Sequence, residues 1–157
     1  MLGRLQIIFK ILFFISIFLT SSKAEILKPN SDIKPSEVVK IQLSGLQKND
    51  LEFKDSGIEQ TWNFAHPNNK KFTGPLEKFK ILLNSDSYKM LLNHVEHNII
   101  EVKTTDSIAA YQVTVLGEGK NYYKFRWIVE KYEIDGPLKG CWLTTGVSQP
   151  VSLGSSI

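Results

Sequence analysis

The stretch Ser107–Val147 reads SIAAYQVTVLGEGKNYYKFRWIVEKYEIDGPLKGCWLTTGV and decides the fold. Within Tyr122–Tyr132, every second residue from Tyr123 to Val129 is large and apolar or aromatic, and the residues between them are mostly polar. This alternation predicts a β-strand with one buried face. Ser107–Leu116 has apolar residues on both alternations, which favours a central strand. Gly140–Val147 is predicted to form a third strand.

Two turns connect these strands in antiparallel succession. Gly117-Glu118-Gly119 contains two glycines, which would allow a positive φ without steric strain. Asp135-Gly136-Pro137 is a strong turn signal. Pro150 marks the end of the last strand, because proline cannot donate a hydrogen bond to a ladder.

The residues before this sheet predict helices. Pro35 is suited to the first helical position, and an apolar stripe follows it as far as Leu46. A second helix is predicted over Gly57–Ala65, with Asp55 or Ser56 as its cap.

The middle of the chain predicts a loop, a third helix and one more strand. His66-Pro67 ends the second helix, because the residue before proline avoids the α region. Residues 67–73 are predicted to form a loop, and Thr73 to cap a third helix that continues to Leu83. His94–Lys103 returns to extended structure. The chain is therefore predicted to have an α+β fold, with N-terminal helices covering one face of an antiparallel sheet.

The first residues have the composition of a secretory signal peptide. Arg4 and Lys10 supply the positive flank of Met1–Ala24, and Ile11–Leu19 is a short apolar core. Small residues at Ser22 and Ala24 form a cleavage site before Glu25. The chain is thus expected to be exported, to the periplasm, the thylakoid lumen or the extracellular space.

The alternative is an uncleaved membrane anchor formed by residues 5–22. The uncharged run is short for that role, because a spanning helix needs roughly 20 apolar residues. After cleavage, residues 25–34 are predicted to be a flexible tether, and residues 35–157 a single domain.

Cleavage also changes the charge. The full chain has 19 Lys+Arg and 16 Asp+Glu, and removal of Arg4, Lys10 and Lys23 leaves equal numbers of each sign. A mature chain without net charge does not favour a nucleic acid as partner, and any membrane contact is expected only through an uncleaved leader.

Cys141 is the only cysteine, so an exported chain would have no internal disulfide. A reactive thiol or an intermolecular disulfide is one interpretation. A small buried residue is favoured instead, because Cys141 shares its strand alternation with Leu143 and Val147.

Several motifs stand out between about Lys34 and Val147, and the most specific are Gly74-Pro75-Leu76-Glu77-Lys78-Phe79 and Gly140-Cys141-Trp142. The others are Val38-Val39 through Leu46 with Gln42 between, Gly57-Ile58, Phe64-Ala65-His66-Pro67, Tyr88, Leu92-Asn93-His94, Gln112, Trp127 and Leu143-Thr144-Thr145-Gly146-Val147. Together they resemble an uncharacterised protein family, the domain of unknown function 4864. The family is similar to the nuclear transport factor 2-like superfamily.

The resemblance implies a cone, in which helices pack inside a curved antiparallel sheet with a pocket at the open end. Members of that superfamily commonly pair through the outer sheet face, so a homodimer is a further expectation.

Nine residues are candidates for lining such a pocket. They combine aromatic walls with a few polar contacts, as binding sites for small molecules do. They are Trp62, Phe64, Tyr88, His94, Gln112, Arg126, Trp127, Trp142 and Thr144.

Three classes of function remain open. We expect a non-catalytic module that binds a small apolar ligand, or an accessory protein that binds a protein partner. The alternative is a small-molecule enzyme, of an isomerase or dehydratase kind, that uses His94 or Tyr88 as acid or base. No catalytic residue is predicted from a motif, because no convergent set of side chains is present.

No cofactor or metal is predicted. His94 and His97 are three residues apart, and on a strand this spacing directs the two rings to opposite faces. Only a helical or looped backbone there would bring both rings to one ion. The glycines at 117 and 119 lack the third glycine and the following helix of a nucleotide-binding loop.

Overall fold

The computed structural model describes residues 26–155, so the predicted signal peptide lies outside the described residues. The fold is α+β with an antiparallel sheet, as predicted. The helices are α2 (Pro35–Gln47), α3 (Ser56–Asn63), α4 (Pro67–Thr73), α5 (Leu76–Leu83) and the 3₁₀ turn η1 (Lys89–Leu91). The strands are β1 (Glu96–Thr104), β2 (Ile108–Leu116), β3 (Asn121–Lys131), β4 (Trp142–Val147) and β5 (Val151–Ser155).

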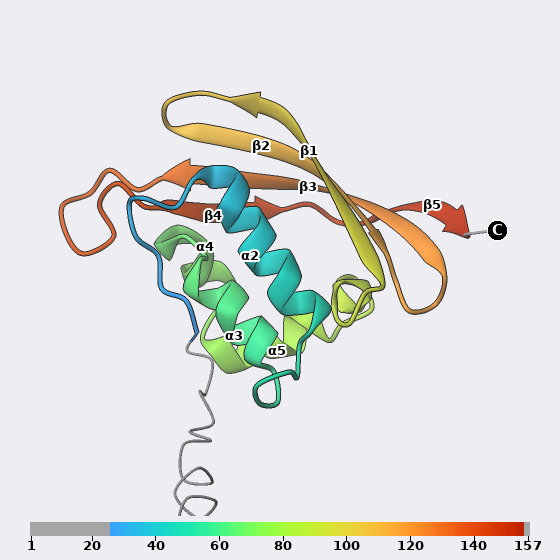
Figure 1. The fold of residues 1–157 in the computed structure, drawn as a ribbon. Helices are drawn as coiled ribbons and strands as arrows, with labels where there is room; N and C mark the ends of the chain where they lie inside the picture. The colour runs from blue at the N-terminus through green and yellow to red at the C-terminus, as the bar shows by residue number, and fades with distance from the viewer. Residues whose placement is uncertain (1–25, 156–157) are drawn as a thin grey trace, which may run out of the picture.

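The strands of the described residues form one twisted sheet in the order β1-β2-β3-β4, and β5 pairs with the other end of β3. All pairs are antiparallel. Figure 1 shows the helices gathered on one face of this sheet, with the other face uncovered. We call these the inner face and the outer face.

The alternation predicted for β3 is confirmed. Phe125, Trp127 and Val129 are buried on the inner face, whereas Arg126 between them is exposed. β2 is a central strand, as predicted, since β1 and β3 flank it. The extended segment predicted at His94–Lys103 is also present as β1.

The strand β5 was not predicted. The chain leaves β4 before Pro150, but it continues in the same direction along the same edge of β3 and pairs with it again through Asn121–Lys124. All residues of β5 are exposed, so β5 has no buried alternation from which it could be recognised.

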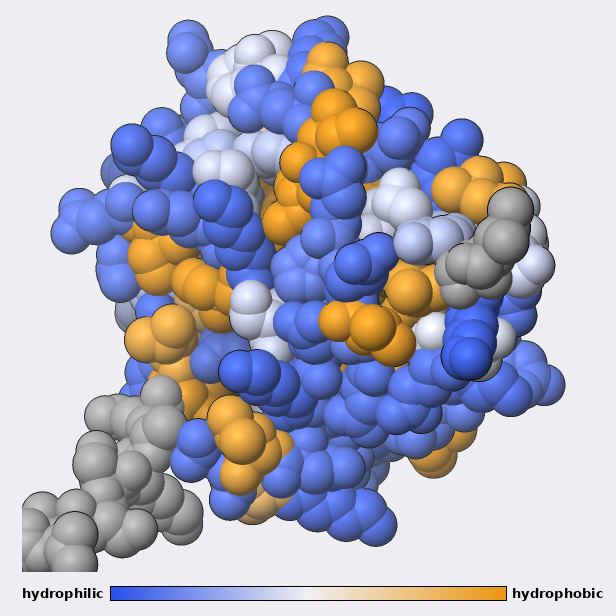
Figure 2. Space-filling model, turned by 45° about the vertical axis from the view of Figure 1, so that its right-hand side comes forward, coloured by the Kyte–Doolittle hydropathy of each residue, from blue (hydrophilic) through white to orange (hydrophobic). Residues whose placement is uncertain are grey.

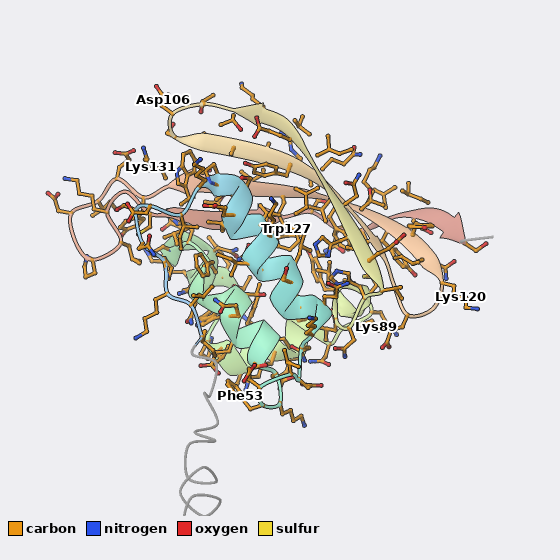
Figure 3. The ribbon with its side chains drawn as sticks, viewed as in Figure 1. Phe53, Lys89, Asp106, Lys120, Trp127 and Lys131 are labelled. Carbon is orange, nitrogen blue, oxygen red and sulfur yellow. The ribbon has the colours of Figure 1, made fainter. Side chains whose placement is uncertain are left out.

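Helix α2 connects the helices to the sheet. The carboxylate of Glu37 accepts a hydrogen bond from the Lys34 backbone N–H at 2.8 Å, which satisfies one free donor at the helix start. The buried stripe predicted for α2 packs against β1, β3 and β4. Trp127 lies between α2 and the sheet, at the centre of the core (Figure 3).

The start of α3 differs from the prediction. Asp55 stands at the cap position but has a left-handed backbone, with φ of 64°, and its side chain does not cap the helix. Asn49 caps it instead: its side-chain oxygen accepts from the Ile58 N–H at 3.0 Å, and its backbone oxygen from the Gly57 N–H at 2.9 Å. The cap thus comes from the end of α2, which fixes the two helices to each other.

The prediction of a loop over residues 67–73 is wrong, because this segment forms helix α4. Pro67 occupies the first turn, where its missing N–H costs nothing, and His66 Nδ1 accepts from the Asn68 N–H at 3.0 Å. Thr73 does not cap the next helix, since its hydroxyl donates to the Asn69 carbonyl inside α4.

The described part of the predicted tether, residues 26–34, contains neither helix nor strand. It still contacts the domain: the Gln60 side-chain amide both accepts from the Leu27 N–H and donates to the Leu27 carbonyl. Among the described residues, no helix is both long and apolar enough to cross a membrane. Hydrophobic residues on the surface shown in Figure 2 form separate patches among hydrophilic ones.

Candidate functional site

A pocket of about 80 Å³ lies between the helices and the inner face of the sheet. Its walls are mostly aliphatic and aromatic, with polar contributions from Gln42, Thr61, Asn69, Thr73, Tyr88 and Thr144. One water molecule needs ~10–15 Å³, whereas pockets for drug-sized ligands measure roughly 300–1,000 Å³. The pocket is therefore of a size for a small molecule, or for the end of a larger one.

A buried polar network forms one wall of this pocket. The Trp127 indole N–H donates to Gln42 Oε1 at 3.0 Å and to Thr144 Oγ1 at 3.3 Å. The Thr144 hydroxyl donates to the same Gln42 oxygen at 2.6 Å, and Gln42 Nε2 donates to the Thr61 carbonyl at 3.0 Å. These buried groups satisfy one another, which holds their side chains in one orientation.

The elements behind this network explain its position. Gln42 lies on the buried stripe of α2, and Trp127 on the inner face of β3. Thr144 is held on β4 by the segment that follows α3: its N–H donates to the Phe64 carbonyl, and its carbonyl accepts from the His66 N–H, both at 2.8 Å. Three separate parts of the chain therefore meet at this wall.

Tyr88 lies at another part of the pocket. Its hydroxyl donates to the Val147 carbonyl at 3.4 Å and accepts from Gln149 Nε2 at 3.3 Å. Burial raises the pKa of the Tyr88 hydroxyl, so this group is neutral at physiological pH. Among the described residues that line the pocket, Tyr88 is the only one with a titratable side chain.

Three of the nine predicted residues line this pocket: Tyr88, Trp127 and Thr144. Phe64 is fully buried in the core. Trp62 packs beside Phe79, with ring centroids 5.2 Å apart. The Lys131 ammonium lies 5.6 Å from the ring centroid of Trp142.

The other three predicted residues lie elsewhere. Gln112 and Arg126 are opposite each other on neighbouring strands and line a hollow on the outer face. His94 is buried beside His97 and does not line the pocket.

The sequence interpretation did not include Gln42, Thr61 or Asn69 among the pocket residues, although all three line it. A signal for Gln42 was present. It lies four residues after Val38 and four before Leu46, so it is a polar side chain on the buried stripe of a helix. Buried amides need partners, and such a residue therefore predicts a polar network.

The prediction that His94 and His97 lie on opposite faces was wrong. His94 precedes the first residue of β1, so the two residues do not share a strand backbone. His94 Nε2 and His97 Nδ1 are 2.7 Å apart, and His94 Nδ1 lies 2.7 Å from the Leu91 carbonyl oxygen. Because a carbonyl only accepts, His94 carries its proton on Nδ1, and His97 Nδ1–H donates to His94 Nε2. In residues 26–155 no group of three or more His, Cys, Asp or Glu side chains is placed to hold a metal ion.

We expect the histidine pair to make folding pH-dependent. Burial lowers the pKa of His94, with His97 acting in the same direction and the Leu91 carbonyl opposing it, and burial lowers the pKa of His97. As pH falls below the unfolded histidine value of about 6.5, the unfolded chain binds more protons than the folded one, and the free energy of unfolding decreases.

Urea unfolding at a series of pH values measures this effect. The double variant His94→Gln/His97→Gln should show a shallower loss of stability between neutral and acidic pH than the wild type. Equal slopes in the two proteins would contradict the assignment of this dependence to the pair.

Cys141 is buried, as predicted. Burial raises the pKa of its thiol, so the nucleophilic thiolate is disfavoured. The side chain therefore packs as a small apolar residue.

A scan against protein-family models, a search of curated proteins and a search of solved structures each found no match to this chain. The resemblance to the domain of unknown function 4864 family thus stays an expectation from the sequence.

Proposed function

We propose that this protein is a binding module that holds a small, neutral, largely apolar molecule in the pocket beside Trp127. The observation that carries this proposal is the chemistry of the pocket wall. It is mainly apolar, its polar wall is the network of Gln42, Thr144 and Trp127, and Tyr88 is its one titratable residue among those described. A wall of this kind offers no charged side chain to pair with an ionic ligand, so a neutral ligand is favoured.

Catalysis is the weaker candidate. Among the described residues that line the pocket, Tyr88 alone has a titratable group that could act as a general acid or base, and burial raises its pKa away from neutrality. His94, the other predicted acid or base, directs its two ring nitrogens to Leu91 and His97. A pocket with one neutral phenol fits recognition better than acid–base chemistry, which benefits from a pKa close to the working pH.

The setting of this function is also a proposal. The leader motif supports export before the module acts, and the sequence motifs support membership of the domain of unknown function 4864 family, with a cone-like arrangement of helices in the sheet. In an accessory role, the module would present its ligand, or its own surface, to a protein partner.

Binding can be tested with three probes that share one carbon skeleton: isobutyramide, isobutyrate and isobutylammonium. We expect the indole N–H resonance of Trp127 to shift on titration with isobutyramide and to respond at least about tenfold more weakly to the two charged probes. Two-dimensional nuclear magnetic resonance of the nitrogen-labelled protein measures this directly.

A matched pair of variants serves as the control. Ala65→Leu fills the pocket wall and should abolish the response. Ala110→Leu makes the same substitution at a buried residue of the sheet that does not line the pocket, and should leave the response intact. A response to all three probes alike, or one that survives Ala65→Leu in a folded protein, would refute the proposal.

A further inference from the structure

The outer face of the sheet has two neighbouring hollows, which play no part in the pocket described above. The larger measures about 340 Å³ and includes Val102, Gln112, Lys124 and Val151 in its lining. The smaller measures about 190 Å³ and includes Lys103, Ile108, Ala110 and Ile128. Arg126 lines both, so the two hollows meet at its side chain.

Strand register brings these side chains together. Gln112 lies opposite Arg126 on the neighbouring strand, and Val151 of β5 lies opposite Lys124. A register shift between Glu101 and Lys103 inserts Val102 into β1 as an extra residue. This residue is 65% exposed and adds an aliphatic wall to the larger hollow.

The charges that line the two hollows are of one sign. Three cationic side chains line the hollows, Lys103, Lys124 and Arg126, and no carboxylate does. The ion pairs within the described residues involve other lysines, at positions 80, 89 and 139. The three cations that line the hollows are therefore without a carboxylate at salt-bridge distance among those residues.

The floor of the smaller hollow is apolar and recessed, whereas Val102, Ile108 and Val151 are exposed at the walls of the two hollows. Ala110 is buried, and Ile128 is half-buried, so the smaller hollow has an aliphatic floor. A matching partner must have protruding aliphatic side chains beside negative charge. The geometry points to an acidic segment of a partner protein that docks on the outer face, with a carboxylate on Arg126 and aliphatic side chains in the two hollows.

Other occupants fit this surface less well. Single-stranded nucleic acid needs aromatic rings on which bases stack, whereas Tyr111 and Phe125, which line the larger hollow, are each only 1% exposed. A second copy centred on Arg126 would bring the same three cations of each copy together, which costs free energy.

Three labelled peptides test the proposal: alternating Glu–Val, alternating Lys–Val and alternating Glu–Ser, with blocked ends and equal length. Fluorescence polarisation should show that the full chain binds the Glu–Val peptide at least about tenfold more tightly than either of the others. Its affinity should fall as salt shortens the Debye length from about 30 to 8 Å. Comparable affinity for Lys–Val or Glu–Ser would overturn the proposal, as would no binding to any peptide.

Matched variants locate the site. Arg126→Gln should weaken Glu–Val binding about tenfold or more, and Lys139→Gln, at an exposed lysine outside both hollows, should leave it nearly unchanged. Since Arg126 is an exposed residue, the first variant should stay folded, which circular dichroism checks. Equal affinities of the two variants would place binding elsewhere and overturn the assignment.

Two further measurements separate the competing occupants. Sedimentation velocity that shows a dimer, dissociated by Arg126→Glu, would assign the face to a second copy. Flotation with vesicles of equal parts phosphatidylglycerol and phosphatidylcholine, lost in Arg126→Glu, would assign it to lipid. Either result overturns the proposal of a protein segment, and a monomer that ignores vesicles but binds the Glu–Val peptide supports it.

Discussion

Replacement of Gly57 with alanine is expected to be among the most destabilising single changes in this protein. A Cβ at Gly57 would overlap the backbone oxygen of Gly45 and would lie 2.9 Å from Cα of Asn49. Both obstacles are backbone atoms of α2 and its end, so no side chain can rotate away. The helices α2 and α3 would have to separate, and Asn49 would lose its hydrogen bonds to the start of α3. We expect a loss of roughly 4 kcal/mol or more in the free energy of unfolding, measured by urea denaturation.

Gly45→Ala is the matched control. It changes the other glycine of the same contact, but its Cβ would meet its nearest neighbours at 3.4 Å, which is ordinary packing. Because alanine is the better helix former, the change should lie within about 1 kcal/mol of the wild type. Similar losses in both variants would show that the close approach at Gly57 is not what holds α2 against α3.

The second large effect is expected for Gln42→Leu. Leucine removes the acceptor for both the Trp127 indole and the Thr144 hydroxyl, and the donor to the Thr61 carbonyl. Each buried group left without its partner costs about 1–3 kcal/mol, and the effects of neighbouring groups are not additive. A total loss of about 3–5 kcal/mol in the free energy of unfolding is therefore expected.

Gln47→Leu changes the same residue type in the same helix and is the control. Its amide donates to the Val95 carbonyl in an exposed position, so its loss should cost less than about 1 kcal/mol. If both variants were equally stable, the network beside Trp127 would not be a stabilising element of the core.

The features predicted correctly are those encoded in long local patterns. The alternation along β3 and the apolar stripe of α2 each extend over several residues, so one exceptional side chain does not obscure them. In contrast, α4 has no buried residue and β5 only exposed ones. The formation of α4 depends on the His66 side chain at the helix start, and that of β5 on the edge of β3 with which it pairs. Neither feature produces a periodic pattern in the sequence.

The pocket was predicted in part, and the errors have a physical reason. Arg126 and Trp127 were assigned to one pocket, although adjacent residues of a strand point to opposite faces. The same alternation that buries Trp127 places Arg126 on the outer face. The amide of Gln42 was missed because its role depends on partners that are 85 and 102 residues away in the sequence.

Because β5 contributes to the outer face, binding at that face is coupled to local unfolding of β5. Every residue of this strand is exposed, and its Val151 forms part of the wall of the larger hollow. A partner that contacts Val151 binds only molecules in which β5 is paired, so part of its binding free energy is spent on holding that strand in place. By reciprocity, occupation of the hollow should slow hydrogen exchange at the amides of β5 more than at those of β2, which lies at the centre of the sheet.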